Sequence, residues 1–233
     1  MDIVIDIETI PSQCEKVKQR FIDEVKAPGQ YKKQESIDAW LAENREAEAD
    51  AQWRKTSFDG GLGHIAVIGF SIDDGDPVAL YSENYVNDEK TVIRSFYDAV
   101  NDAVEKDLRG GYSAKQSVRF VGHNVSSFDL RFLFQRSVVL GIKPPCCIPF
   151  KAKPWEDSIF DTMSEWAGFG NKVALSKLVD VLGLQEKGAE IGEEIDGSMV
   201  WDFVKAGKIK QVAEYCKGDV IRTREAYKKL TFL

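Results

Sequence analysis

The start of the chain alternates between apolar and polar side chains, which is the pattern of a half-buried β-strand. In the segment 2–7, the isoleucines at odd positions share one face, while Asp2, Val4 and Asp6 share the other. Pro11 lacks the N–H group that a strand ladder uses, so the strand should end before it. The sequence therefore predicts a first strand with a buried apolar face and an acid on its opposite face.

Later apolar runs predict the other strands and helices. Short runs rich in β-branched residues are typical of strands, and longer amphipathic segments are typical of helices. We expect strands at 64–72, 78–82, 118–121 and 157–161, and helices at 89–108, 127–140, 173–182 and 208–229. Strands that come first and then alternate with helices indicate an α/β fold, with a mixed sheet flanked by helices on both faces.

The segment 12–57 interrupts this pattern because it is polar and highly charged. Its sequence around SIDAWLAENREAEADAQW predicts one or two helices that contribute little to a core. No internal repeat or low-complexity linker divides the rest of the chain. We therefore expect residues 1–233 to form a single domain, with 12–57 as a charged helical insertion.

Composition excludes several classes of protein. Hydrophobic residues make up 43% and charged residues 30%, which excludes wholesale disorder. No apolar run is long enough to cross a bilayer, and the start MDIVIDIE carries acids where a secretory signal needs positive charge. The sequence contains no GxGxxG or Walker motif, which a nucleotide-binding α/β domain would need. These features predict a cytoplasmic protein with no membrane partner.

Cysteine and histidine usage indicates what kind of metal the chain could hold. The 4 cysteines form no CxxC pair, and only 2 histidines are present, so a zinc site is not favoured. Any metal is expected to be a hard ion with oxygen ligands, as Mg²⁺ or Mn²⁺ would be.

The net charge of −7 is unusual for a nucleic-acid-binding protein, but the charges are unevenly distributed. The segment 108–155 contains one acid, Asp129, whereas the segment 35–50 is strongly acidic. A basic face around Asp129 would hold phosphates, and basic residues scattered over a solvated surface are the equal alternative. The basic residues of 108–155 are Arg109, Lys115, Arg119, Arg131, Arg136, Lys143, Lys151 and Lys153.

Two acids at the end of the first strand are candidate metal ligands. Asp6 and Glu8 are two residues apart on a strand, so their carboxylates should emerge on the same face. Two carboxylates so close repel each other unless a cation lies between them. The D-x-E pattern also arises by chance, and its position before Pro11 is what makes it a candidate.

Two further acids have both a structural and a functional interpretation. Asp129 falls in the first turn of an expected helix, where an acid also favours the helix N-terminus, with Ser126 or Ser127 as N-cap. Tyr215 and Asp219 are four residues apart and should share a helix face, although a core-edge tyrosine beside a surface acid would look the same.

Taken together, these residues resemble the three exonuclease motifs of family B DNA polymerases. The motifs are DIET at 6–9, G-x-N-x-x-x-F-D at 122–129 and Y-C-x-x-D at 215–219. The segments 55–71 and 196–219 are also similar to stand-alone members of this group, known mainly from phages and bacteria. The resemblance covers nearly the whole chain except the charged region near 12–54. It implies a ribonuclease H-like fold of the DnaQ-like superfamily and a metal-dependent 3′-5′ exonuclease.

The resemblance also implies roles for single residues. The tyrosine form of the motif fits, because Tyr215 is present while Glu214 stands where the other form has histidine. Tyr215 would orient the attacking water. Ser127 departs from the polymerase pattern, which has a second asparagine there. The implied ligands of two Mg²⁺ or Mn²⁺ ions are Asp6, Glu8, Asp129 and Asp219, and the implied substrate contacts are Thr9, Asn124 and Phe128, with core packing an equal role for Phe128.

The expected substrate is the 3′ end of mainly single-stranded DNA, which would be released as nucleoside 5′-monophosphates. An RNA exonuclease or oligoribonuclease on the same fold is the first alternative, because a pocket for the 2′-hydroxyl cannot be identified in a sequence. A nucleic-acid-binding derivative without catalysis is the second alternative. It is disfavoured because all four acids and the tyrosine are present.

Overall fold

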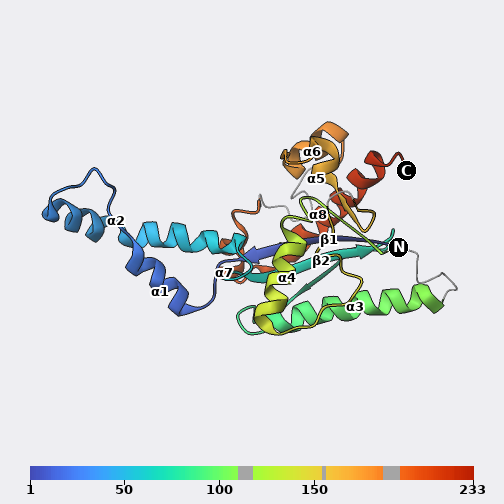
Figure 1. Ribbon diagram of the computed structural model, residues 1–233, viewed down its shortest axis with the longest axis horizontal. Coiled ribbons are helices and arrows are strands. Elements are labelled where there is room, and N and C mark those ends of the chain that lie inside the picture. Colours follow the sequence, from blue (N-terminus) through green and yellow to red (C-terminus); the bar gives the residue numbers. More distant parts are fainter. Residues whose placement is uncertain (110–117, 154–155, 186–194) are drawn as a thin grey trace.

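A central mixed β-sheet organises the protein (Figure 1). The structure, a computed structural model, describes residues 1–109, 118–153, 156–185 and 195–233. Within these residues the sheet has five strands in the order β3-β2-β1-β4-β5. β2 is antiparallel to both β1 and β3, whereas β1, β4 and β5 run parallel to one another. The strands are β1 (Asp2–Ile10), β2 (His64–Ile72), β3 (Val78–Tyr81), β4 (Arg119–Gly122) and β5 (Ile159–Asp161).

Helices cover both faces of this sheet. The helical elements are α1 (Glu15–Glu24), α2 (Gln34–Arg54), the 3₁₀ turn η1 (Lys55–Phe58), α3 (Glu89–Arg109), α4 (Asp129–Leu140), α5 (Thr162–Ala167), α6 (Leu175–Leu182), α7 (Val200–Lys205) and α8 (Ile209–Leu230). None of the helices in the described parts of the chain combines the length and apolar character needed to cross a bilayer.

The alternation in β1 decides which helices lie on which face. Ile3, Ile5 and Ile7 are buried in one core cluster together with apolar side chains of α3 and α4. Val4 lies on the opposite face, where it packs with residues of α8. Ile10, also on that face, joins a second cluster built from α7 and α8. The two-residue period of the strand therefore directs even-numbered side chains of β1 toward α8.

The helices α1 and α2 extend away from the sheet (left in Figure 1). α1 has no buried residue, and α2 buries only Ala49 and Trp53 near its C-terminal end. This region is helical and polar, as its sequence predicts.

The α/β fold class is confirmed, with a mixed sheet and helices on both faces. The first strand continues to Ile10, three residues beyond the predicted segment, because it pairs with β2 along that length. The short helices α5 and α7 were not predicted from the sequence. Each has only 6 residues, too few to show a helical period.

Candidate active site

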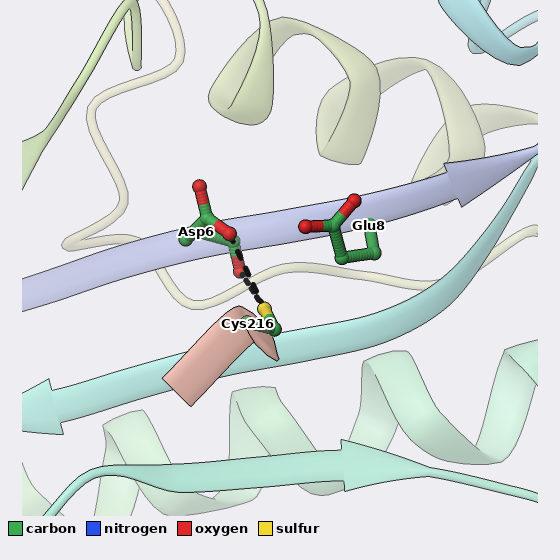
Figure 2. Close-up of side chains that lie close together, drawn as sticks. All are labelled: Asp6, Glu8 and Cys216. Atoms are coloured by element: carbon green, nitrogen blue, oxygen red, sulfur yellow. Dashed lines mark hydrogen bonds between the residues drawn. The ribbon is translucent and has the colours of Figure 1, made fainter. Parts of the chain in front are cut away.

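Asp6 and Glu8 lie side by side on the face of β1 that is turned toward α8 (Figure 2). Asp6 is half-buried, and Glu8 is buried. The pairing of β1 with β2 is irregular beside Glu8. Glu8 pairs with Val67, but the next residue of β1 pairs with Ile65, so one residue of β2 is skipped. The extra residue, Ala66, forms a β-bulge, a feature that often re-aims side chains next to active sites.

Asp129 is delivered to the same place by the start of α4. Its Oδ1 accepts a hydrogen bond of 3.0 Å from the backbone N–H of Ile7, the residue between Asp6 and Glu8. The Asp129 side chain is buried, and burial followed by the negative charge of Asp6 raises its pKa well above the ordinary value. Asp129 is therefore fixed against β1 and feels the Asp6 carboxylate.

Tyr215 and Asp219 both lie on α8, the helix on which their spacing predicts a shared face. Both are buried. Burial is the main cause that raises the pKa of the Tyr215 hydroxyl, and the charges of Asp219, Glu8 and Asp6 add to it in that order. Because burial and these charges raise its pKa, the hydroxyl keeps its proton and can donate a hydrogen bond. Asp219 also forms an ion pair with the buried Arg222, with 3.2 Å between the Asp219 Oδ1 and the Arg222 Nη1.

Cys216 is a site residue that the sequence analysis did not single out. Its buried thiol lies 3.3 Å from Oδ2 of Asp6 and donates a hydrogen bond to it (Figure 2). Burial, followed by the charges of Asp6 and Glu8, raises the pKa of this thiol well above its ordinary value. A Cβ atom at Gly69 of β2 would lie 2.7 Å from the Cys216 sulfur, so glycine is what lets α8 come this close. The feature of the sequence that could have identified Cys216 is its position next to Tyr215.

The donor set at this place fits a hard divalent cation. One carboxylate oxygen each from Asp6 and Glu8 and the sulfur of Cys216 lie within 4.8 Å of one another. The carboxylate charges that help to raise the pKa values of Asp129 and Tyr215 are charges that a bound cation would offset. Carboxylate oxygens suit Mg²⁺ or Mn²⁺, whereas a protonated thiol is a poor ligand for either ion.

The three expected substrate contacts occupy different local environments. The Thr9 hydroxyl donates a 2.7 Å hydrogen bond to the carbonyl of Ser57, which ties β1 to η1. Asn124 lies in the loop between β4 and α4 with a φ of 64°, a left-handed conformation that asparagine tolerates. Phe128 is half-buried, and its ring lies 6.4 Å from that of Phe58 in η1. Phe58 is 71% exposed and was not predicted as a site residue.

The predicted N-cap of α4 is wrong. The cap position is Phe128, which makes no side-chain capping hydrogen bond. The Ser126 hydroxyl instead donates a 3.1 Å hydrogen bond to Asp161. A buried carboxylate is the stronger acceptor, so it takes the hydroxyl that the sequence assigned to the helix end.

Several members of the basic stretch 108–155 are unable to contribute to a basic face or lie outside the described residues. Arg136 is buried and makes a bidentate ion pair with Glu89, at 2.8 and 2.6 Å, so it cannot face a phosphate. Arg119 donates hydrogen bonds to the Asp157 carbonyl and the Tyr227 hydroxyl. Lys115 lies outside the described residues. The basic residues of 108–155 that are exposed are Arg109, Arg131, Lys143, Lys151 and Lys153.

Comparisons with known proteins identify a matching family and a similar fold. A family model described as a predicted 3′-5′ exonuclease related to the exonuclease domain of PolB matches residues 64–233. The family B DNA polymerase from the hyperthermophilic archaeon Pyrobaculum calidifontis has a similar structure, with a TM-score of 0.56 and 14% sequence identity. The match covers 99% of this chain and 24% of the polymerase chain, so it shows a shared fold over about a quarter of that protein. No curated protein sequence matches the chain.

Proposed function

This chain belongs to the family of predicted 3′-5′ exonucleases related to the exonuclease domain of PolB, and we propose that it shortens single-stranded DNA from its 3′ end by a two-metal-ion mechanism. The products would be nucleoside 5′-monophosphates. The observation that carries this proposal is the convergence of three distant segments on one spot. β1 contributes Asp6 and Glu8, the start of α4 contributes Asp129 against Ile7, and α8 contributes the Tyr215–Asp219 face.

The site residues then divide into four metal ligands and one residue that orients the attacking water. Asp6, Glu8, Asp129 and Asp219 would hold two Mg²⁺ or Mn²⁺ ions, which supply an activated water and neutralise charge on the leaving 3′-oxygen when bound. Tyr215 donates a hydrogen bond from its protonated hydroxyl and so orients the attacking water. Because the pKa of that hydroxyl is raised, Tyr215 does not serve as a general base.

A direct assay tests the proposed activity. Purified protein with Mg²⁺ or Mn²⁺ should convert 5′-labelled single-stranded DNA into a ladder of shorter labelled products, and EDTA should stop the reaction. A 3′-labelled strand should release labelled mononucleotide at once. Preferred cleavage of an RNA strand would favour the RNA exonuclease instead. Binding without cleavage of any strand would favour a derivative that has lost catalysis.

Replacing Tyr215 with phenylalanine tests the role of its hydroxyl. Tyr215→Phe is expected to lower kcat by roughly 10- to 1000-fold, the scale of losing an orienting or proton-transfer contribution. Metal affinity should change little, because the four carboxylates remain. Single-turnover kinetics across a Mg²⁺ titration would measure both quantities.

Tyr227→Phe is the matched control for this variant. Tyr227 lies on the same helix, but its hydroxyl donates a hydrogen bond to Asp2 at the start of β1, which is not one of the candidate metal ligands. The control should keep its rate. Full activity in Tyr215→Phe would argue that Tyr215 serves only in packing.

We also propose that residues 1–233 act as one domain, with 12–57 as an insertion whose base is tied to the catalytic fold. The indole N–H of Trp53 donates to the carbonyl of Ser12, and the Trp53 ring packs edge-on against Trp201 at 5.5 Å. Arg54 forms two hydrogen bonds with Asp202 in α7. These contacts place η1, which follows α2, beside the end of β1.

The same contacts suggest where the terminal base of the substrate lies. A cavity of about 210 Å³ opens beyond Thr9, and Lys55, Phe58 and Trp201 are among its lining residues. Phe58 is exposed, and its ring lies next to that of Phe128. Aromatic rings stack on any base, so this pair can hold a 3′ end without sequence preference.

Removal of the Phe58 ring should therefore weaken substrate binding. Phe58→Ala is expected to raise the dissociation constant for single-stranded DNA by roughly 5- to 150-fold, which corresponds to a stacking contribution of about 1–3 kcal/mol. Fluorescence anisotropy with Ca²⁺ in place of Mg²⁺ would measure binding while cleavage is suppressed. Phe232→Ala, which removes a ring that is 96% exposed near the C-terminus, is the control. Equal affinities in the two variants would remove Phe58 from the substrate site.

A further inference from the structure

Asp161 is a buried carboxylate next to the candidate active site that the proposed mechanism does not use. It is the last residue of β5 and the N-cap of α5, and its exposed fraction is 1%. β5 pairs with β4 so that Asp161 lies opposite Gly122, the residue at which the chain leaves the sheet for the loop before α4. A buried charge at this position needs several hydrogen-bond donors.

These donors come mainly from the loop between β4 and α4. Oδ1 of Asp161 accepts a 2.9 Å hydrogen bond from the backbone N–H of Asn124. Oδ2 accepts bonds from the backbone N–H of Ser126 at 3.3 Å and from its hydroxyl at 3.1 Å. The N–H groups of Met163 and Ser164, at 3.1 and 3.5 Å, supply the helix-capping bonds. The Asp161 side chain thus does more than cap α5, because it also accepts hydrogen bonds from Asn124 and Ser126 of the loop.

The loop has a conformation that needs such a restraint. Asn124 has a φ of 64°, which only a small share of non-glycine residues adopt. The turn is also tight, because a Cβ atom on Gly122 would lie 2.5 Å from the Cβ of Val125. Thr162, the neighbour of Asp161, donates a further hydrogen bond of 3.2 Å to the Gly122 carbonyl. Asparagine tolerates this conformation, and the hydrogen bonds with Asp161 and Thr162 hold the loop around it in place.

The loop leads directly to a catalytic candidate. The N–H of Leu130 bonds to the Val125 carbonyl at 2.9 Å, which couples the first turn of α4 to the loop. Asp129, at the start of that turn, meets the N–H of Ile7 through its Oδ1. A shift of the loop would therefore move the Asp129 carboxylate relative to β1.

We propose that Asp161 is a positioning residue that sets the place of the Asp129 carboxylate by holding Asn124 and Ser126. The inference rests on the proposed function, since Asp129 matters there as a metal ligand. Asp161 itself touches neither substrate nor metal in this scheme. Residues that orient metal ligands in this way typically change metal affinity or activity by about 10- to 100-fold when they are replaced.

Asp161→Asn is the informative variant because it keeps the size of the side chain. An amide offers one acceptor oxygen and one NH₂ donor. With the oxygen toward Asn124, the NH₂ group faces the Ser126 N–H, and two donors cannot bond to each other. The hydrogen bond from the Ser126 N–H is lost, while the capping bonds to α5 can remain. Asp157→Asn, at an exposed position just before β5, is the matched control.

Amide hydrogen exchange in the metal-free protein gives the first readout. Asp161→Asn should make the Ile7 amide exchange about 10-fold faster, because that amide reports on Asp129. Amides in the middle of α8 should keep their protection. The second readout is Mn²⁺ binding by calorimetry, where the dissociation constant should rise by about 10- to 100-fold. The third is kcat, which should fall by a similar factor while KM for a short oligonucleotide stays within about threefold.

The outcomes separate positioning from simple support of the fold. A lower Tm with unchanged Ile7 exchange and unchanged Mn²⁺ affinity would show that Asp161 only caps α5, and the proposal would be overturned. If Asp161→Asn does not fold, Ser126→Ala removes one bond from the same carboxylate and should raise the Mn²⁺ dissociation constant by about 2- to 5-fold. An unchanged constant in that variant would also overturn it. Wild-type protein that binds Mn²⁺ but cleaves no nucleic acid would contradict the proposed function, while the exchange and binding results would still decide the role of Asp161.

Discussion

Replacement of Asp6 with alanine is expected to lower the nuclease rate by at least about 1000-fold while the fold persists. In the proposed scheme Asp6 would be one of the four carboxylates that hold the ions, so its removal would disturb both the activation of the water and the stabilisation of the leaving oxygen. A loss of several kcal/mol of charge stabilisation corresponds to three or more powers of ten in rate. Initial rates on labelled single-stranded DNA at saturating Mg²⁺ would measure the effect.

The fold should survive because Asp6 is only half-buried and its side chain repels other carboxylates. Without metal, the variant should melt at the wild-type temperature or above it. Asp2→Ala is the matched control. Asp2 lies on the same strand and face as Asp6, but its carboxylate accepts a hydrogen bond from Tyr227 and does not belong to the candidate metal ligands. A residual rate of more than a few per cent in Asp6→Ala would contradict the assignment of Asp6.

The central part of the fold was predictable because its sequence pattern is local. Alternation in residues 2–7 predicts a strand with two unlike faces, and the structure packs those faces against different helices. Long amphipathic helices such as α3 and α8 were also predicted close to their observed ends. The short helix α5 was not, because its start depends on the hydrogen bonds of Asp161 and not on a periodic pattern.

Spacing also predicted which candidate residues share a face, but not which elements meet. The two-residue spacing of Asp6 and Glu8 places them side by side, as the structure has them. Nothing in the spacing predicts that Asp129 bonds to Ile7, because that contact spans 122 positions of the chain. Only the resemblance to the polymerase motifs brought those segments together in advance.

Charge runs gave the least reliable predictions. The basic stretch 108–155 was interpreted as a possible surface, yet Arg136 within it is buried against Glu89. A run of like charges in the sequence contains no information about the pairing of its members in space. An arginine on the inner face of a helix needs an acid from another element, and Glu89 lies 47 positions away.

Asp129→Asn is expected to abolish activity and, in the absence of metal, to stabilise the protein at neutral and alkaline pH. The rate should fall by at least about 1000-fold, since an uncharged amide is a poor ligand for Mg²⁺. The amide oxygen can still accept the bond from the Ile7 N–H, so the packing of α4 should be preserved. Both effects come from the negative charge of Asp129. This charge would bind the metal ion, and it destabilises the folded protein when no metal is bound.

The pH dependence of that stabilisation follows from the direction of the pKa shift. Burial, followed by the charge of Asp6, raises the pKa of folded Asp129 well above its ordinary value. Between the unfolded pKa, about 3.9, and the raised folded pKa, the folded state therefore binds more protons than the unfolded state. The stability of metal-free wild-type protein should fall as pH rises through this window. Asparagine cannot lose a proton, so this contribution is absent from the variant.

Thermal melts in EDTA at pH 4 and pH 8 would measure the difference. The two proteins should melt at similar temperatures at pH 4. At pH 8 the variant should melt higher, by roughly 2–4 °C for each kcal/mol of relieved cost. Asp102→Asn, at an exposed position in α3, should leave the melting temperature unchanged at both values of pH. Addition of Mn²⁺ should then reverse the order at pH 8, because only the wild-type protein gains stability from binding the ion. A variant that melts below wild type in EDTA at pH 8 would mean that the Asp129 carboxylate stabilises the empty fold, and its proposed place among repelling ligands would be wrong.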